Sequence, residues 1–338
     1  MNFLPWPEIS NFHNLRKYLK QFPEVLEGFG KVRYFAKVKL DGTNAAVVIT
    51  SDKEVGAQSR GKIITPNDDN MGFARWVDSQ KDHWEKLSYS GGDLVIFGEW
   101  SGKGIQKNVA ISQISKKVFA VFSVVYRDTD GHIGCTFDPA EIKKILGDIP
   151  DVYVLPWFSQ QGENFSTTID WLSSAENLQS ELDRINQAVL DVEVCDPWVK
   201  ENFGVEGIGE GLVFYPLGAF IDNWTKFSTF LFKAKGEKHK TIKQSAPAQA
   251  NAEVANSAKE FADLVLTEAR LEQGAKAVGG DVVSYDMKLI GKFLKWIETD
   301  VKKETSAELA ASQLTWDQVS KNVTNQARQW YLEKNKTL

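Results

Sequence analysis

Residues 34–49 read YFAKVKLDGTNAAVVI, and this stretch predicts two strands joined by a tight turn. β-Branched and aromatic residues flank Asp41-Gly42, and an Asp-Gly pair between such runs is a strong turn signal. Successive side chains of a strand point to opposite faces, so Lys37, Lys39 and Asp41 share one face. A lysine at the end of a strand, beside a glycine turn, can present its amine to a pocket.

Lys39 is the candidate nucleophile of this stretch. An amine attacks only after losing its proton, which requires neighbouring cations, desolvation or a metal. Lys37, Lys233 and Lys235 are candidates for the cationic surroundings. The same residues also fit an ordinary hairpin with solvated lysines, so the stretch alone does not establish a catalytic site.

Four further motifs follow in order and favour nucleotide chemistry. Residues 58–60, QSR, supply an arginine that can hold a phosphate or a ribose. Residues 97–100, FGEW, and 210–213, EGLV, each place one carboxylate at the edge of an apolar run. Residues 232–235, FKAK, put two lysines on one face of a strand, which suits a triphosphate or a departing pyrophosphate. Taken singly, each residue could be an ordinary surface or core residue. Their occurrence together and in this order favours a catalytic site.

The composition indicates an ordinary globular protein of intracellular type. A formal net charge of −5 argues against a protein that coats nucleic acid non-specifically, but lysines concentrate from Lys233 to Lys243. Cys135 and Cys195 match no metal-ligand spacing and suit a reducing compartment. The first residues do not resemble a secretory signal, and no apolar run is long enough to span a bilayer. We therefore expect a cytoplasmic or other intracellular location, no membrane contact and a monomer.

The pattern of strands and helices changes along the chain. Short apolar runs rich in β-branched and aromatic residues dominate residues 31–235, interrupted by a predicted helix at about 169–190 capped by Thr167 or Thr168. Residues 244–256, QSAPAQANAEVAN, have the composition of a linker. Apolar spacings of three and four then predict helices through residues 257–338.

The ordered motifs resemble those of the covalent nucleotidyltransferase superfamily of ligases and capping enzymes, where they correspond to motifs I, Ia, III, IV and V. Within it the chain looks most like the RNA ligase 2 family. The resemblance implies an α+β fold, with a nucleotidyltransferase (ATP-grasp-like ligase) domain of antiparallel sheets and flanking helices over residues 1–243. A linker at 244–256 and a small all-helical domain at 257–338 would follow.

The resemblance also implies a role for each matching residue. Lys39 would attack the α-phosphate of ATP and form lysyl-AMP, and Glu99 would hold ribose oxygens. Phe122 would stack on adenine, and Glu210 would place Mg²⁺ or Mn²⁺. Nucleotide contacts are implied for the remaining residues: Asp41, Asn44, Arg60, Lys233 and Lys235, the last two also stabilising charge during transfer.

This sequence departs from the family pattern at three positions. Asp41 stands where phage-type members often carry histidine. Val38 stands where several members have a glutamate that helps to recognise adenine, so adenine selection must use other groups. Ser123 stands where an aspartate usually follows the stacking aromatic, which leaves Phe119 as a rival to Phe122.

The implied activity is ATP-dependent joining of RNA 3′-hydroxyl and 5′-phosphate ends, at nicks in duplex RNA, with RNA and ATP as partners. A DNA ligase or a capping-type nucleotidyltransferase is an alternative, but an OB-fold of five short strands should then follow motif V. A non-catalytic nucleic-acid-binding relative is a second alternative, although the lysine of motif I and the other charged motif residues are present.

Overall fold

The computed structural model describes the chain except for residues 27–29, 88, 90, 219–223, 237–257, 280–283, 306–308, 310–313 and 337–338. It separates into two compact units, Met1–Gly236 and Glu237–Leu338. The predicted linker, 244–256, lies outside the described residues, so the predicted domain boundaries stay predictions. No helix in the described part of the chain is both long and apolar enough to cross a membrane.

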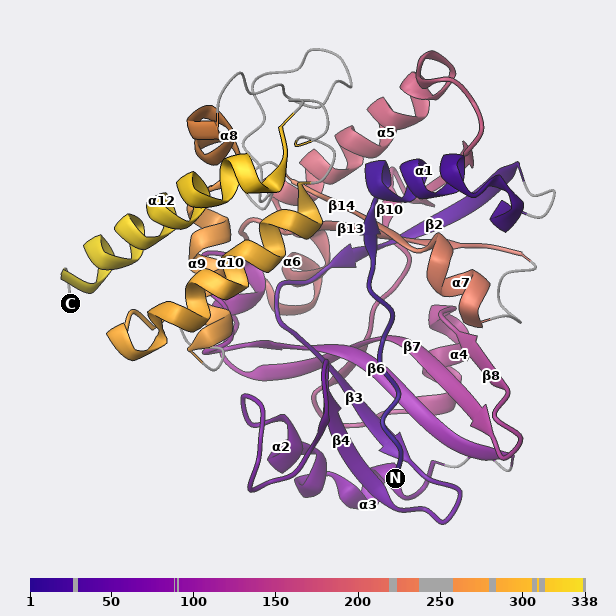
Figure 1. The fold of residues 1–338 in the computed structure, drawn as a ribbon. Coiled ribbons are helices and arrows are strands. Elements are labelled where there is room, and N and C mark those ends of the chain that lie inside the picture. The colour runs from indigo at the N-terminus through magenta and orange to yellow at the C-terminus, as the bar shows by residue number, and fades with distance from the viewer. Residues whose placement is uncertain are drawn as a thin grey trace. The chain divides into compact units, whose positions relative to one another are not determined.

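The first unit is built on two mainly antiparallel sheets (Figure 1). The five-stranded sheet has the order β1 (Ser10–Asn11), β14 (Phe232–Lys235), β13 (Gly211–Pro216), β2 (Lys31–Lys39) and β12 (Ser166–Asp170). The seven-stranded sheet has the order β5 (Ile63–Ile64), β4 (Val55–Ser59), β3 (Thr43–Ile49), β6 (Gly92–Gly102), β7 (Lys117–Asp128) and β8 (Ile133–Thr136), with β9 (Val152–Val154) parallel to β7. A short hairpin joins β10 (Ser159–Gln160) to β11 (Glu163–Asn164).

Helices flank these sheets in the first unit. They are α1 (Phe12–Gln21), η1 (Pro23–Leu26), α2 (Phe73–Ser79), α3 (Lys81–Trp84), η2 (Ala110–Gln113), α4 (Pro139–Leu146), α5 (Ala175–Val194), α6 (Pro197–Phe203) and α7 (Trp224–Phe230). The predicted α+β fold with antiparallel sheets and flanking helices is confirmed. The turn predicted at Asp41-Gly42 is also confirmed, because it separates β2 from β3.

The predicted helix at 169–190 is wrong at its start. Thr167 and Thr168 lie in β12, where they pair with β2. The helix α5 begins at Ala175, and the Ser174 side chain accepts a hydrogen bond from Asn177 N as its N-cap. Thr167 and Thr168 are β-branched residues, which favour strands. They therefore pair with β2 and do not cap the helix.

Two hydrophobic clusters lie on opposite faces of the seven-stranded sheet. The inner cluster includes Phe97 and Phe122 together with Tyr215 of the five-stranded sheet, so it lies between the two sheets. The outer cluster includes Phe119 and packs that face against α2, α3 and α4. Alternation along β6 and β7 sends neighbouring side chains into different clusters. Polar side chains placed among the inner cluster are therefore shielded from water.

The described residues of the second unit are helical. Its elements are α8 (Ala258–Val265), α9 (Glu268–Val278), η4 (Met287–Leu289), α10 (Ile290–Glu304) and α12 (Trp316–Lys336). The chain between α8 and α9 is interrupted at Thr267, whose side chain accepts a hydrogen bond from Arg270 N and caps the start of α9. The predicted helical C-terminal region is thereby confirmed, with its own core of aliphatic and aromatic residues.

Candidate active site

Four lysines share one face of the five-stranded sheet: Lys37 and Lys39 of β2, and Lys233 and Lys235 of β14. β13 lies between these strands and sets the register. Gly211 is opposite both Lys39 and Lys235, while Val213 is opposite both Lys37 and Lys233. Residues directly opposite in adjacent strands project to the same side of a sheet. Residues almost 200 positions apart in the sequence are thus brought onto one surface.

The Glu210 carboxylate bridges two of these lysines. It lies immediately before β13 with a side chain only 5% exposed, and Oε2 accepts a hydrogen bond from Lys39 Nζ at 2.5 Å. Its other oxygen, Oε1, is 2.9 Å from Lys235 Nζ. Burial acts to raise the pKa of Glu210, but the charges of Lys235 and Lys39 outweigh it and hold that pKa at about 2. Glu210 is therefore the anionic centre of the site.

Lys39 is protonated in this arrangement. Burial acts to lower its pKa, but Glu210, Glu99 and Asp41 supply enough negative charge to raise the pKa above the ordinary lysine value. The raised pKa keeps the amine from acting as a nucleophile until something competes with these carboxylates. In this structure Lys39 is therefore a protonated ammonium group bound to Glu210, and it must lose a proton before it can attack.

Glu99 lies on β6, opposite Asn44 of β3, and faces the same cluster. Burial raises its pKa to about 8; Lys39 opposes this, and the nearby charges of Glu210 and Asp41 add to it. The Gly42 backbone N–H donates to this carboxyl group and lowers the pKa in part. Three neighbouring carboxyl groups and the two lysines on Glu210 form a site that an additional cation would stabilise.

Gly42 is required by the close approach of the turn to β6. A Cβ atom added at Gly42 would lie 2.6 Å from the Trp100 carbonyl oxygen and 2.2 Å from Ser101 Oγ. The Gln106 side chain also donates to the Gly42 carbonyl oxygen at 3.0 Å. The Asp-Gly pair therefore lets the end of β2 reach the strand that carries Glu99.

Phe122 and Phe119 lie on opposite faces of β7. Phe119 packs in the outer cluster, with its ring centroid 5.0 Å from that of Phe73. The β6–β7 register shifts so that Gly98 pairs with Val121 and Phe97 with Ser123, which leaves Phe122 as the extra residue of a β-bulge. Its side chain joins the inner cluster between the sheets.

Arg60 is the predicted site residue that the structure does not bring to this cluster. It follows β4 and is exposed, without a hydrogen bond or ion pair to the carboxyl groups described above. Asp41 lies in the β2–β3 turn and Asn44 lies on β3, both adjoining Glu99 electrostatically or by strand pairing. The other predicted residues converge between the sheets, while Arg60 lies at the rim of β4.

Trp6 packs against Phe122 at the site, and the sequence did not predict this contact. Its ring lies 4.8 Å from Phe122 and 5.0 Å from Phe97, centroid to centroid. The Gln58 side chain anchors the segment, accepting from Leu4 N and donating to Leu4 O at 2.6 Å. An isolated tryptophan near the N-terminus carries no periodicity, so no sequence signal could have placed it behind Phe122.

Lys37 is fully buried between the two sheets. Its ammonium donates to the Phe122 carbonyl oxygen at 3.0 Å. The ring centroids of Trp157 and Tyr215 lie 5.0 and 5.4 Å from Lys37 Nζ. Burial lowers the pKa of Lys37 to about 7, although the charge of Asp138 acts to raise it. Strand alternation predicted the face of Lys37, but only the packing shows that it is enclosed.

We expect Lys37→Met to raise the melting temperature by roughly 2 to 5 °C at pH 6.5. Lys37 binds its proton less tightly in the folded chain, so the unfolded state binds more protons between about pH 7 and 10.5. The contribution of Lys37 to the stability of the wild type therefore rises with pH across that window, and its charge penalty is largest below it. Thermal melts of both proteins from pH 6.5 to 9 should show the variant's advantage shrinking; an advantage that grows with pH would contradict this account.

The carboxyl groups fit a divalent cation held mainly by substrate. No cluster of three or more metal-ligating side chains forms a ready cage within the described residues. Magnesium commonly uses one or two carboxylates and completes its shell with water and phosphate oxygens. Glu210, with Glu99 and Asp41 close enough to perturb one another electrostatically, provides hard oxygen donors of that type. The same face of the five-stranded sheet carries lysines suited to phosphates.

A model of the RNA ligase family matches residues 32–235. The chain belongs to the RNA ligase family. The match begins in β2 and ends in β14, so it includes every residue of the lysine and carboxylate cluster. The residue roles stay predictions, because membership of the family does not itself assign them.

Solved structures of Naegleria gruberi RNA ligase are similar to this RNA ligase family member. An apo point mutant is 20% identical with a TM-score of 0.44, covering 70% of this chain and 57% of that one. A mutant with ATP and Mn is 19% identical with a TM-score of 0.44, covering 70% and 58%. The form with pyrophosphate is 19% identical with a TM-score of 0.44, and the match covers 70% of this chain and 57% of that one. The matched part spans less than two thirds of those chains.

Proposed function

We propose that this protein is an ATP-dependent RNA ligase that joins a 3′-hydroxyl to a 5′-phosphate through lysyl-AMP on Lys39. The observation that carries the proposal is the Glu210 carboxylate held between Lys39 and Lys235, inside the region matched by the RNA ligase family. Nucleotidyl transfer requires that the phosphates be positioned and their negative charge neutralised. The lysines would neutralise phosphate charge, and the carboxylates would hold the divalent cation. ATP and Mn appear with the Naegleria gruberi RNA ligase mutants, which is consistent with the proposed cofactors.

The resting contacts suggest how the nucleophile is released. Glu210 would hold a divalent cation, which would supply positive charge to the carboxylate in place of the Lys39 ammonium. Loss of the Lys39–Glu210 ion pair would remove the largest cause that raises the lysine pKa. Lys39 can then give up its proton and attack the α-phosphate. Lys233 and Lys235, on the same face of the sheet, are placed to hold phosphate oxygens as pyrophosphate departs.

The placement of the aromatics supports Phe122 rather than Phe119 as the adenine platform. Phe122 belongs to the cluster between the sheets, whereas Phe119 packs outward with Phe73. Glu99 on β6 is then proposed to hold the ribose between the base and Lys39, with Asn44 and Asp41 beside it. Arg60 is proposed to reach the nucleotide or the RNA from the rim of the site.

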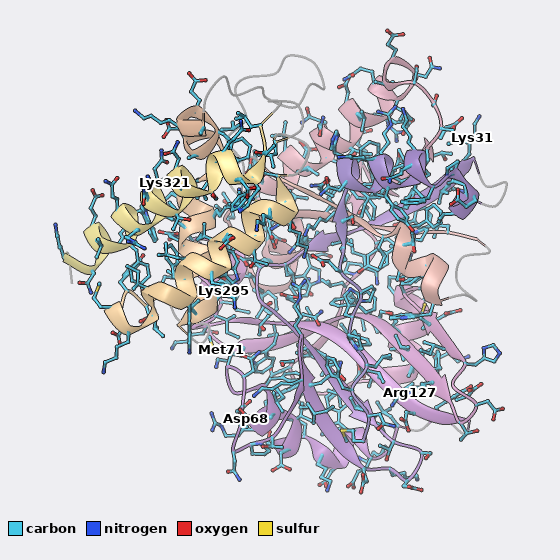
Figure 2. The ribbon with its side chains drawn as sticks, viewed as in Figure 1. Lys31, Asp68, Met71, Arg127, Lys295 and Lys321 are labelled. Atoms are coloured by element: carbon cyan, nitrogen blue, oxygen red, sulfur yellow. The ribbon has the colours of Figure 1, made fainter. Side chains whose placement is uncertain are left out.

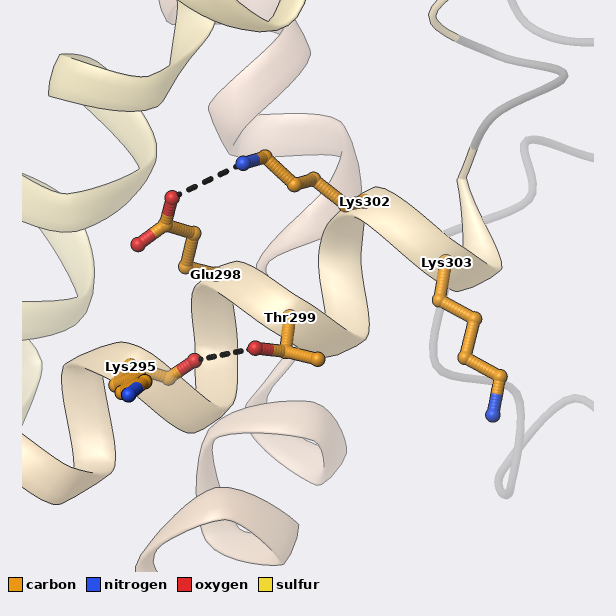
Figure 3. A pocket seen from close by; sticks show the side chains of 5 residues that line it. All are labelled: Lys295, Glu298, Thr299, Lys302 and Lys303. Atoms are coloured by element: carbon orange, nitrogen blue, oxygen red, sulfur yellow. Dashed lines mark hydrogen bonds and ion pairs between the residues drawn. The ribbon is translucent and has the colours of Figure 1, made fainter.

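The second unit is proposed to contact RNA phosphates. The exposed lysines of α10 are Lys292, Lys295, Lys302 and Lys303. Figure 3 shows the pocket on α10 that is lined by Lys295, Glu298, Thr299, Lys302 and Lys303, in which Glu298 pairs with Lys302 at 3.1 Å. Figure 2 shows Lys295 and Lys321 on different helices of this unit. The elements described after residue 257 are all helices, whereas an OB-fold would require strands there. This observation does not support a DNA ligase or a capping-type enzyme.

The test combines covalent labelling with sealing of defined nicks. With α-labelled ATP and magnesium, the protein should acquire a label that is released by pyrophosphate. Nicked duplexes that differ only in ribose or deoxyribose at the 3′-hydroxyl and 5′-phosphate strands should show sealing that requires RNA at the 3′-hydroxyl side. Absence of the label sinks the ligase proposal, whereas labelling with equal sealing of all-DNA nicks would favour a DNA ligase. We propose that the protein acts as a monomer.

A further inference from the structure

Lys37 raises a question that the proposed function leaves open. The motif that supplies the nucleophile begins at Lys39, and Lys37 is two residues earlier on the same face of β2. A fully buried ammonium is costly unless its surroundings compensate it. A side chain with only a structural purpose at this position would ordinarily be apolar, as its neighbours Ala36 and Val38 are.

The ammonium of Lys37 reaches across from one sheet to the other. Its acceptor is the main-chain oxygen of Phe122, on the seven-stranded sheet. Phe122 is the bulged residue of β7, so its carbonyl group is not committed to the regular ladder with β6. The alternation of β7 shifts directly after Phe122, because Val118 and Ala120 share its cluster whereas Val124 lies in the outer one. A hydrogen bond to the Phe122 carbonyl group holds the backbone at this shift, and with it the ring.

Aromatic rings fix the lysine end of this contact. Trp157 and Tyr215 lie close enough to Lys37 Nζ for cation–π attraction, and Tyr215 is on the neighbouring strand β13. Trp6 supports the other side of the arrangement by packing edge-on against the Phe122 ring. The ring is thus located by a main-chain bond from Lys37 and by a side-chain contact from Trp6.

We propose that Lys37 is a positioning residue for the nucleobase, holding the Phe122 bulge so that the ring presents a fixed face to the adenine of ATP. This inference rests on the proposed function, because it assigns Phe122 as the base platform. It also supplies a physical answer to the absence of an acidic residue at Val38: base binding depends on a stacking surface whose position is set by a buried cation. The partner of this subsite is the purine ring of a nucleoside triphosphate.

The test measures lysyl-AMP formation in single-turnover reactions over a range of ATP concentrations. Lys37→Met should raise the half-saturating ATP concentration about 10-fold, the scale of losing part of one base–aromatic stack, and leave the maximal rate within about 3-fold. Lys37→Arg, which can still donate to the carbonyl oxygen, should recover much of the affinity. Lys31→Met removes an exposed lysine from the same strand and should behave as the wild type.

A double-mutant cycle decides whether Lys37 acts through the ring. Phe122→Leu should itself raise the half-saturating ATP concentration, and adding Lys37→Met to it should cause less than a 2-fold further change. An equal 10-fold effect of Lys37→Met in both backgrounds would overturn the proposal, because Lys37 would then act on the nucleotide without Phe122. So would an unchanged half-saturation in Lys37→Met. Failure of the wild type to form lysyl-AMP would instead overturn the proposed function.

Variants that fold poorly would not be confused with the expected result. The maximal rate per active site, titrated by the amount of lysyl-AMP formed at saturating ATP, separates loss of affinity from loss of folded protein. A proportional loss of active sites in Lys37→Met and Lys37→Arg, with unchanged half-saturation, would mean that Lys37 is structural and would overturn the proposal.

Discussion

Lys39→Ala is expected to abolish covalent labelling by α-labelled ATP, with a loss of at least about four orders of magnitude in the rate of adenylylation. Lys39 is the lysine of the Asp-Gly turn motif and lies 2.5 Å from the carboxylate proposed to hold the metal. Alanine removes the nitrogen that would form the bond to phosphorus, and no rearrangement of the remaining groups restores it. Gel autoradiography at saturating ATP and magnesium measures the loss.

Lys39→Arg is the matched control for charge. The guanidinium keeps a cation beside Glu210 but remains protonated, so labelling should be lost as completely as in the alanine variant. Peptide mapping of the wild-type adduct should locate AMP on the peptide containing Lys39. A label that survives in Lys39→Ala, or maps to Lys37 or Lys235, would sink the assignment of the nucleophile.

Glu210→Gln is expected to slow adenylylation by about 10²- to 10³-fold and to raise the magnesium concentration required for half-maximal rate. Glutamine keeps the size of the side chain but lacks the charge that balances Lys39 and Lys235 and that would hold a divalent cation. Single-turnover labelling over a magnesium titration measures both effects. Glu206→Gln is a suitable control, because Glu206 is exposed and pairs with Lys200 at the surface.

The direction of the Glu210 effect separates two roles of the carboxylate. Glu210 contributes strongly to the raised pKa of Lys39, so its neutralisation lowers that pKa and makes the amine easier to deprotonate. If the carboxylate served only as a resting partner of Lys39, Glu210→Gln would be faster than the wild type below pH 9. A slower variant with an increased magnesium requirement supports the metal role, and a faster one with an unchanged requirement rejects it.

The candidate site was largely predictable because strand periodicity fixes the face of each charged residue. Lys39, Lys233 and Lys235 alternate with apolar residues in short strands, and that alternation survives in the register of β2 and β14. The order of the motifs then indicated which strands carry phosphate-binding groups. Arg60 was predicted with the same reasoning, yet it lies exposed after β4, because a motif that ends a strand does not fix the direction of the following loop.

The start of α5 shows where local signals fail. Thr167 and Thr168 are acceptable helix caps by sequence, but these β-branched residues pair with β2 instead. The N-cap of α5 is Ser174. Capping preferences amount to about 1 kcal/mol, which is less than the gain from adding a strand to a sheet with a buried face. Tertiary pairing therefore overrides the local signal.

The sequence by itself determined the strand-rich core, the helical C-terminal region, the turn at Gly42 and the lysines and carboxylates of the ordered motifs, because periodicity and turn chemistry are local. Strand alternation places Phe119 and Phe122 on opposite faces of β7, but only the tertiary structure decided that the Phe122 face is the interior one. It also decided that Lys37 is enclosed by two aromatic rings and bonded to the opposite sheet. Those facts depend on which distant strands pack together, and no spacing within one strand contains that information.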